Sequence, residues 1–357
     1  MITISLCMIV KNEQDTLGRC LDSAKGIADE IIVVDTGSTD STKEIARQYT
    51  QQIYDFPWND DFAAARNFSF SKAQMDYCMW LDADDVILPA DWLALLELKQ
   101  TLDPQTDVVM LKYHTAFDKN DTPLYSYYRE RLLRRSDGFL WEGRVHEVIT
   151  PRGNIYYSDA GIAHKKLQPG DPDRNLRIYE KMLAEGNRLD PRQQFYYARE
   201  LVFHRRWQDA KNILTCFLDD RLGWIENNID ACRQLAACCR ALCDEKGELD
   251  ALLHSFSYDV PRAEVCCDIG EYFLRREEWR TAAYWYQRAL ECERSDVSGG
   301  FVLPDCYGYI PALQLCLCCH KLGNRQKAME YNELAGQFKP DSEAYQYNKQ
   351  YFNATSK

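Results

Sequence analysis

Residues 75–89, MDYCMWLDADDVILP, place three carboxylates directly after an apolar run. The run at 78–81 has the length and composition of a buried strand, and Asp82, Asp84 and Asp85 follow it before apolar residues resume. Neighbouring carboxylates repel one another, and burying them is costly unless a cation neutralises them. The stretch therefore predicts a strand that carries charge to the edge of a sheet. The alternative is an acidic turn in which Asp85 starts a helix.

Residues 1–115 alternate short β-branched runs with amphipathic stretches. The run EIIVVDT at 30–36 is apolar almost throughout, which is typical of a parallel strand buried on both faces. Strands that alternate with helices indicate βαβ units, so we predict an α/β domain with a mostly parallel, Rossmann-like sheet. The predicted strands are 2–10, 30–36, 52–55 and 77–81, and the predicted helices are 16–24, 41–49 and 62–73.

Residues 107–167 have a different pattern, with longer strand-like runs separated by hydrophilic loops. We expect these runs to extend the same sheet in a mixed or antiparallel arrangement. The predicted strands are 107–114, 128–135, 143–149 and 154–165.

From about residue 172 onward the pattern is helical throughout, and a repeat is present. The copy IGEYFLRREEWRTAAYWYQRALEC at 269–292, centred on Ala282, has small and aromatic residues where the tetratricopeptide (TPR) pattern requires them. Further copies centre on Ala210, Ala251 and Ala328. Because one repeat cannot bury its own apolar face, four copies predict a stacked helical solenoid. The alternative is a generic helical bundle.

The chain has 357 residues, enough for about two domains, and we place these at 1–170 and 171–357. Its net charge of −12 argues against nucleic acid as a partner, because phosphate backbones bind basic surfaces. We expect no membrane span, since no run of 18 or more apolar residues occurs. The N-terminal stretch MITISLCMIVKNE lacks the basic start of a signal peptide, so a cytoplasmic location is expected.

Fifteen cysteines are present, and most of them lie within helical periodicity. Cys316, Cys318, Cys319 and His320 raise the question of a zinc site, but they fall in an amphipathic helix pattern rather than in facing C-x2-C pairs. We therefore interpret the cysteines as buried reduced thiols, which behave as small apolar residues and suit a reducing compartment.

Polar side chains follow three of the predicted parallel strands. Lys11, Asn12 and Glu13 follow the first strand, residues 35–40 end the second, and residues 82–85 follow the strand at 77–81. Ligands of open parallel sheets bind beyond the carboxyl ends of the strands, so these clusters predict one site. No G-x-G-x-x-G turn follows the first strand and no P-loop motif is present, which weakens dinucleotide and P-loop readings. The carboxylates instead predict a hard cation, Mg²⁺ or Mn²⁺, that bridges a diphosphate.

The motifs SLCMIVKNEQDTLGRCLDSAKGIADEIIVVDTGSTDSTKEIA, ARNFSFSKA and WLDADD occur in this order within residues 2–90. Together they resemble the N-terminal half of a family 2 glycosyltransferase with the GT-A fold. The later segments RLLRR, GRVHE and AHKK resemble further signatures of that family. A domain of this kind followed by tetratricopeptide repeats is similar to bacterial enzymes that glycosylate peptides or proteins, including peptide cysteine S-glycosyltransferases. GRVHE is also similar to a segment of glycosyltransferases of lipopolysaccharide-core assembly.

The resemblance implies that a nucleotide-sugar donor, most often a UDP-sugar, binds at this edge of the sheet. Asp35 would accept a hydrogen bond from an N–H of the base. Arg66 and Asn67 would lie beside the nucleotide or its phosphates, where an arginine fork suits phosphate geometry. The other residues that would frame the nucleotide-sugar pocket are Val10, Lys11, Asn12, Glu13, Gly37, Asp82 and Ala83.

The same resemblance assigns Asp82 and Asp84 to a D-x-D motif. Asp84 would bind the Mn²⁺ or Mg²⁺ ion, and Asp82 would lie near the ribose or a metal-bound water. His164 would complete the metal shell, since imidazole is a reasonable Mn²⁺ ligand, with Lys165 and Lys166 alongside for phosphate. The alternative for His164 is an exposed residue near the domain junction.

Inversion at the anomeric carbon, which the resemblance also implies, requires a general base for an acceptor hydroxyl. The candidates are Glu142, His146 and Glu147 in FLWEGRVHEVI. In a regular strand, residues 146 and 147 point to opposite faces, so only one of them faces the pocket. We favour Glu147 as the base, ahead of Glu142 and His146, and a purely structural role is the alternative for each.

These features predict a metal-dependent, inverting hexosyltransferase whose acceptor is a peptide or protein bound in the concave groove of the repeats. A first alternative is transfer to lipopolysaccharide or another cell-envelope glycan. A second is a non-catalytic scaffold with a degenerate GT-A domain. A nucleotidyltransferase fits less well, because KNEQDTLGRC lacks a Gly-rich, basic phosphate loop. The alternative role of the repeats is a homodimer interface.

Overall fold

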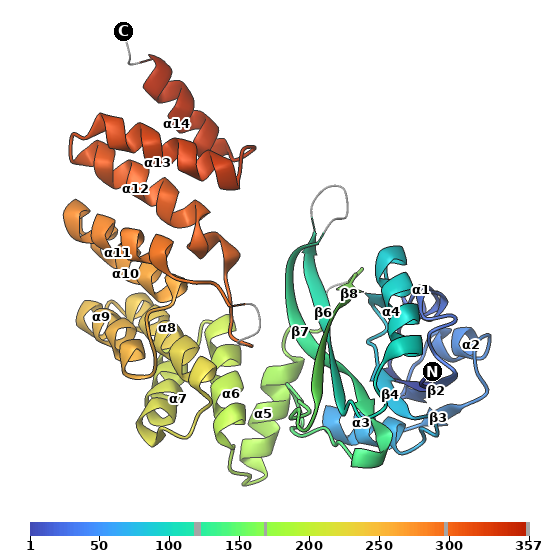
Figure 1. The fold of residues 1–357 in the computed structure, drawn as a ribbon. Coiled ribbons are helices and arrows are strands. Elements are labelled where there is room, and N and C mark those ends of the chain that lie inside the picture. Colours follow the sequence, from blue (N-terminus) through green and yellow to red (C-terminus); the bar gives the residue numbers. More distant parts are fainter. Residues whose placement is uncertain (118–122, 168–169, 296–298, 355–357) are drawn as a thin grey trace. The chain divides into compact units, whose positions relative to one another are not determined.

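The computed structural model describes residues 1–117, 123–167, 170–295 and 299–354 (Figure 1). The chain forms two compact units, Met1–Arg188 and Leu189–Lys357. Helix α5 (Arg174–Ala184) belongs to the first unit, where Lys181 Nζ of this helix lies 2.5 Å from Asp60 Oδ2. The predicted division at 170/171, taken as a boundary between independently folding domains, stays a prediction.

The first unit contains one mixed sheet, whose strand order in the described residues is β3-β2-β1-β4-β7-β6-β8-β5. β1 runs parallel to β2 and β4, and β2 runs parallel to β3. β7 is antiparallel to β4 and β6, while β8 is parallel to β6 and antiparallel to β5. The predicted α/β fold, with a parallel core and a mixed extension, is thus confirmed. The strands are β1 (Ile4–Val10), β2 (Glu30–Asp35), β3 (Ile53–Asp55), β4 (Tyr77–Trp80), β5 (Asp85–Val86), β6 (Val108–Phe117), β7 (Pro123–Arg134) and β8 (Ile155–His164).

Helices cover both faces of the parallel strands, as the apolar runs predict. On one face, Leu6 and Met8 of β1 pack in the same core as Leu21 of α1. On the other face, Val34 of β2 packs with Phe68 of α3. Besides α5, the helices are α1 (Leu17–Ser23), α2 (Thr42–Ala46), α3 (Phe62–Phe70) and α4 (Pro89–Thr101), all visible in Figure 1.

The sequence pattern predicts a strand at 143–149, and this prediction is wrong. The segment makes an isolated bridge between Glu142 and Val148 and otherwise has an irregular course. Gly143 and His146 have φ values of 95° and 52°, in the left-handed region, and these break the extended conformation. The argument that residues 146 and 147 point to opposite faces of a strand therefore does not apply.

The second unit consists of helix pairs that match the four predicted repeat copies. Ala210, Ala251, Ala282 and Ala328 are buried, each in the second helix of its pair. Consecutive pairs also pack together, α7 on α8 and α11 on α12. The pairs are α6 (Pro191–Phe203) with α7 (Trp207–Asp220), α8 (Ile225–Ala241) with α9 (Glu245–His254), α10 (Ala263–Arg275) with α11 (Trp279–Glu291), and α12 (Tyr309–Lys321) with α13 (Arg325–Phe338), followed by α14 (Glu343–Ala354).

Gly270 of α10 explains why this repeat pattern needs small residues. A Cβ atom at position 270 would lie 2.9 Å from the ring of Tyr286, which is itself almost fully buried in α11. The absence of a side chain lets the two helices approach, and the tyrosine ring fills the space between them. No helix in the described ranges is long and apolar enough to cross a membrane.

All fifteen cysteines are free thiols, and twelve of them are buried. Cys316, Cys318 and Cys319 are buried in α12, as the helical periodicity predicts. Cys243 is an exception, because it is exposed just beyond the end of α8 and has a φ of 60°. Most cysteines thus pack as small apolar side chains.

Candidate functional site

The carboxyl ends of β1, β2 and β4 lie at one edge of the sheet. Val10, the last residue of β1, is in register with Asp35, the last residue of β2. Cys7 of β1 is in register with Trp80 at the end of β4, and the acidic stretch begins at Asp82. The three polar clusters found in the sequence therefore meet at one edge.

Two loops at this edge are tied together by side chains. The Asn12 N–H donates to Ser38 Oγ at 2.9 Å, and Asn12 Oδ1 accepts from the Thr39 N–H at 2.8 Å. The Glu13 N–H donates to Thr42 Oγ1 at 2.7 Å. Asn12 has a φ of 56°, a left-handed conformation that asparagine tolerates better than most residues. Hydrogen bonds within the chain thus hold the frame of the predicted nucleotide pocket.

Asp35 lies at the centre of this frame, with its side chain almost fully buried. Its Oδ1 accepts hydrogen bonds from the Gly37 and Ser38 N–H groups at 2.9 and 3.0 Å. Gly37 has a φ of 105°, which allows the chain to turn back over the carboxylate. Asp35 Oδ2 is enclosed and has no hydrogen-bond partner among the described residues. Such an atom costs about 1–3 kcal/mol, which a ligand N–H would recover once neighbouring side chains move aside.

Arg66 of α3 links two acidic residues from different parts of the chain. Its Nη2 donates to Asp82 Oδ1 at 2.8 Å, and its Nε donates to Glu147 Oε1 at 2.7 Å. The guanidinium lies against the rings of Trp80 and Trp141, 5.1 and 4.7 Å from their centroids. Its Nη1 is enclosed without a partner in the described part of the chain. One arginine donor thus stays available for an anion.

Burial and ion pairing act in opposite directions on Arg66 and Asp82. Desolvation alone would lower the pKa of Arg66, but the carboxylates of Asp82 and Glu147 raise it above its ordinary value. Desolvation alone would raise the pKa of Asp82, but Arg66 and Arg131 lower it instead. Both groups are therefore charged at neutral pH.

Asn67, next to Arg66, is engaged at both ends of its amide. Its Nδ2 donates to the Trp141 carbonyl at 2.9 Å, and its Oδ1 accepts from the Trp141 N–H at 2.8 Å. This pair of bonds fastens α3 to the segment that carries Glu147. The predicted place of Asn67 beside a nucleotide stays a prediction, and the contacts seen here are those of a residue that positions its neighbours.

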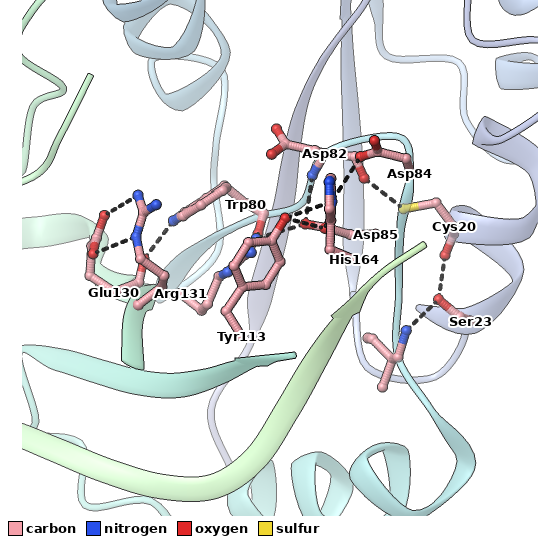
Figure 2. A network of polar contacts seen from close by, with 12 residues as sticks. Cys20, Ser23, Trp80, Asp82, Asp84, Asp85, Tyr113, Glu130, Arg131 and His164 are labelled. Carbon is pink, nitrogen blue, oxygen red and sulfur yellow. Dashed lines mark hydrogen bonds and ion pairs between the residues drawn. The ribbon is translucent and has the colours of Figure 1, made fainter. Parts of the chain in front are cut away.

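Asp84, Asp85 and His164 form a cluster in which one ligand atom from each residue lies within 4.8 Å of the others. His164 is the last residue of β8, and its Nδ1 is 3.5 Å from Asp84 Oδ1. The Lys165 N–H donates to the Asp84 carbonyl at 2.9 Å, which keeps the end of β8 against the acidic stretch. Figure 2 shows these side chains gathered around the turn from β4 to β5.

The cluster carries more negative charge than its cationic partners neutralise. Desolvation raises the pKa of Asp84, and the charges of Asp82 and Asp85 raise it further, although His164 lowers it. Desolvation also raises the pKa of Glu13, despite its hydrogen bond from Thr16. A divalent cation would relieve both effects, and two carboxylates with an imidazole suit Mg²⁺ or Mn²⁺. The donor set therefore fits the cation that the sequence predicts.

Residues 5–156 match the family described as glycosyl transferase family 2. These residues form a family 2 glycosyltransferase domain. The match covers the sheet edge that carries Asp35, Arg66, Asp84 and Glu147. It ends before His164, so the last residue of the acidic cluster is contributed from outside the matched range.

Three curated relatives match this chain over part of their length. A TPR repeat-containing protein of Synechococcus elongatus is 36% identical over 42% of this chain and 36% of that protein. The SPbeta prophage-derived glycosyltransferase SunS of Bacillus subtilis is 26% identical over 76% of this chain and 65% of that protein. The lipopolysaccharide core biosynthesis glycosyltransferase LpsC of Rhizobium meliloti is 29% identical over 43% and 59%. This chain thus spans between about one third and two thirds of the length of these relatives.

Of the three candidate bases in the family 2 domain, Glu147 is the one that contacts Arg66, and its side chain is 13% exposed. Glu142 is exposed. His146 stacks on Tyr179 of α5, with ring centroids 6.3 Å apart. The structure thus brings Glu147 to the acidic cluster through Arg66, although its role as a base stays a prediction.

The other predicted site residues differ in burial. Val10 and Ala83 are buried, whereas Lys11 and Lys166 are exposed. Lys165 Nζ lies 3.3 Å from the centroid of the Phe117 ring rather than free in solvent. The roles of Lys11, Lys165 and Lys166 stay predictions.

Sequence reasoning assigns no site role to three residues at or beside the cluster, namely Asp85, Tyr113 and Arg131. The alternative interpretation, in which Asp85 starts a helix, is wrong, because Asp85 lies in β5 and is fully buried, and α4 begins four residues later. Arg131 adjoins two leucines in β7, and a charge in such a run was a signal that it needs a buried partner. Tyr113 of β6 gave no signal, because its role depends on strand pairing.

Proposed function

We propose that this chain transfers a sugar from a nucleoside diphosphate donor to an acceptor, with the help of a divalent cation. One observation carries the proposal. One sheet edge of a family 2 domain carries both the Asp84–Asp85–His164 cluster and two enclosed polar atoms, Asp35 Oδ2 and Arg66 Nη1, that lack partners in the described residues. Such atoms are what a nucleotide and its diphosphate would satisfy.

The donor would lie along the edge from Asp35 to Asp84. Asp35 Oδ2 would accept an N–H of the base, which favours a uracil-like base over one that offers only acceptors there. Arg66 would direct Nη1 to a phosphate oxygen while its other nitrogens keep Asp82 and Glu147 in place. Lys43, whose ammonium is 3.8 Å from Asp35 Oδ1, would have to move as the base enters.

Asp84 and His164, together with the free oxygen of Asp82, would hold the Mn²⁺ or Mg²⁺ ion. When bound, such an ion supplies positive charge to the leaving diphosphate. Asp84 Oδ1 and His164 Nδ1 lie 3.5 Å apart, although the two residues are distant in the sequence. The oxygen-rich donor set suits both manganese and magnesium.

Glu147 would take the proton of an attacking acceptor. Its Oε1 is engaged by Arg66, so Oε2 is the atom that would accept the proton. Arg66 fixes the direction of the carboxylate, which places a base where it is needed at the moment of reaction. Such a base on the face opposite the leaving group gives inversion.

We further propose that the acceptor is a peptide or protein, because stacked helix pairs form extended surfaces that suit an unfolded chain. The similarity to the lipopolysaccharide core biosynthesis glycosyltransferase LpsC keeps a cell-envelope glycan as a second candidate. A homodimer formed through the repeats and a cytoplasmic location also stay predictions. The non-catalytic scaffold is disfavoured by the crowded carboxylates, whose cost a scaffold has no reason to retain.

Titration calorimetry with UDP and with GDP, each with and without Mn²⁺, tests the donor part of the proposal. We expect UDP to bind in the presence of Mn²⁺, and Asp84→Asn to abolish that binding. Asp159→Asn is the matched control, because Asp159 is an exposed carboxylate of the same unit whose side chain is 93% accessible. If neither nucleotide binds in the presence of Mn²⁺, the result supports the non-catalytic scaffold instead of the enzyme.

Slow hydrolysis of UDP-glucose, UDP-galactose, UDP-GlcNAc and GDP-mannose would then identify the sugar. Radiolabelled donor, incubated with the chain and a cell lysate, separates the acceptors. Label that enters protein supports the peptide acceptor, and label that enters lipid or glycan supports the LpsC-like alternative.

A further inference from the structure

The second unit contains a cavity of about 190 Å³ whose walls carry several charged side chains. α8 and α10, the first helices of two consecutive pairs, contribute residues to it, and residues 300–302 form a further wall. Four carboxylates and two guanidinium groups line the cavity, together with apolar side chains. The charged lining residues are Glu226, Asp230, Arg233, Arg262, Glu264 and Glu293.

The two arginines of the cavity join α8 to α10, and carboxylates already pair with both of them. Arg262, directly before α10, donates from Nη2 to Glu226 Oε1 at 2.9 Å and to Asp259 Oδ2 at 2.8 Å. Arg233 of α8 donates from Nε to Asp268 Oδ2 of α10 at 2.6 Å. Asp259 and Asp268 lie outside the lining of the cavity, so they add negative charge beside it. This balance of charge disfavours an anionic ligand.

Two carboxylates of α8 keep oxygen atoms that could accept further hydrogen bonds. Glu226 is 8% exposed, and its Oε2 makes no hydrogen bond with the described residues. Asp230 is 5% exposed, accepts from Gln234 Nε2 at 3.3 Å, and lies 3.6 Å from Arg233 Nη1. Four residues apart on one helix, the two carboxylates lie on the same face. Because enclosed carboxylates are costly without donors, a cationic donor would stabilise both.

Apolar groups beside these carboxylates suit the stem of a long basic side chain. Ile229 of α8 lines the cavity, and Phe301 and Val302 line it from the segment before α12. Glu264 of α10 holds this segment in place by accepting a hydrogen bond from the Leu303 N–H at 2.7 Å. The methylene groups of lysine and arginine bury against apolar surface while their charged ends reach polar groups. The cavity is far larger than the roughly 10–15 Å³ that one water needs, so it has room for such a side chain.

From this combination of charge and apolar lining we propose that the cavity binds one basic side chain of the acceptor polypeptide. The inference rests on the peptide acceptor of the proposed function, and it adds a chemical requirement, namely a basic residue in the segment that the helix pairs bind. Arginine suits the cavity better than lysine, because its planar fork can donate to Glu226 and Asp230 at the same time. A network that only fastened α8 to α10 would leave Glu226 Oε2 without a donor.

Fluorescence anisotropy with the full-length chain tests the cavity without any donor sugar. The probe is a fluorescein-labelled peptide of four Gly-Ser-Arg units, and the comparison peptide has citrulline, which keeps the shape of arginine but carries no charge. At about 0.15 M ionic strength, distant exposed charges are largely screened. We expect wild type to bind the arginine peptide about tenfold more tightly, as for one hydrogen bond between charged groups. This comparison changes only the peptide, so the folding of a variant does not enter it.

Two double variants that remove the same charge locate the site. Glu226→Gln/Asp230→Asn should bind the two peptides equally, whereas Glu330→Gln/Glu343→Gln should keep the tenfold preference for arginine. Glu330 and Glu343 are exposed residues of α13 and α14, so the control also removes two carboxylates from the second unit. Thermal unfolding shows whether each variant is folded.

Equal affinity of wild type for the two peptides, or binding of neither, overturns the inference. So does a preference for arginine that persists in folded Glu226→Gln/Asp230→Asn. These results leave the donor part of the proposed function intact, because UDP binding with Mn²⁺ is measured separately and reports on the sheet edge. A chain that prefers the arginine peptide but binds no nucleotide would keep the cavity as a site for a basic side chain and would overturn the proposed function.

Discussion

The carboxyl edge of the sheet and the helix pairs of the second unit treat their buried groups in opposite ways. At the sheet edge, atoms of Asp35 and Arg66 are enclosed without partners in the described residues, and carboxylates crowd together. In the helix pairs, Gly270 leaves just enough space for the ring of Tyr286. The unpaired groups at the sheet edge lower the stability of the folded chain, whereas close packing in the helix pairs raises it. Function and stability should therefore respond to different mutations.

The largest effect is expected for Asp84→Asn. Loss of the cation should reduce kcat/KM for sugar transfer or donor hydrolysis by about 10³-fold, or about 4 kcal/mol. Stability should not fall, because desolvation raises the pKa of Asp84 and the charged form is already disfavoured in the folded chain. Steady-state kinetics and thermal unfolding measured on one preparation would test both halves. An Asp84→Asn variant that is inactive because it is unfolded would contradict the separation of function from stability.

Arg131→Met should affect both properties, since Arg131 supports the sheet edge from inside the core. Removal of Arg131 from its ion pair with Asp85 leaves the Asp85 charge buried, which typically costs about 3–5 kcal/mol. The loss of stability would be measured by urea unfolding, with hydrogen exchange of peptides from β4, β6 and β7 as the probe. The double variant Asp85→Asn/Arg131→Met should regain part of it, because the buried charge is gone. A strictly additive double variant would show that the two residues do not interact.

Gly270→Val should disturb the second unit alone. The added side chain meets the Tyr286 ring, and overpacking of this kind typically costs about 1–3 kcal/mol. Hydrogen exchange should rise in α10 and α11, while the dissociation constant of UDP with Mn²⁺ stays that of wild type. A weaker UDP complex would contradict this expectation and would show that packing of the helix pairs affects binding at the sheet edge.

Local sequence patterns predicted the parallel strands and the repeats well, for a physical reason. The run at 30–36 and the alanines at 210, 251, 282 and 328 report burial through residue type at each position. The same reasoning wrongly predicted a strand at 143–149, because Gly143 and His146 adopt positive φ values that an apolar pattern does not encode.

The acidic stretch shows where such patterns stop. Asp82 and Asp84 were found from their place after a strand, and His164 from its place at the end of another. The partnership of Asp85 with Tyr113 and Arg131 joins β5, β6 and β7, and it depends on the strand order β4-β7-β6-β8-β5. Pairing between strands that are distant in the sequence cannot be read from a local pattern, so the contacts of Asp85 with Tyr113 and Arg131 could not be predicted.

The smallest effect is a dependence of cation stabilisation on pH. Desolvation raises the pKa of Asp84 above 3.8 and that of Glu13 above 4.5. The folded chain therefore binds these protons more tightly than the unfolded chain. Protonation of the two carboxyls stabilises the folded chain at pH values below their ordinary pKa values, and this stabilisation is lost as the pH rises through their raised pKa values. The rise in melting temperature with Mn²⁺ should thus be larger at pH 7 than at pH 5, as measured by calorimetry. An equal rise at both pH values in wild type would contradict the assignment of these carboxyls.

The hydrogen bonds that join Asn12 to Ser38 and Thr39, and Glu13 to Thr42, have a consequence for selectivity. Because these hydrogen bonds fasten the two loops to each other, we expect the distance between the loops to change little when a ligand binds. For the nucleotide of the proposed function, a frame of fixed spacing would favour one ring size of base over the other.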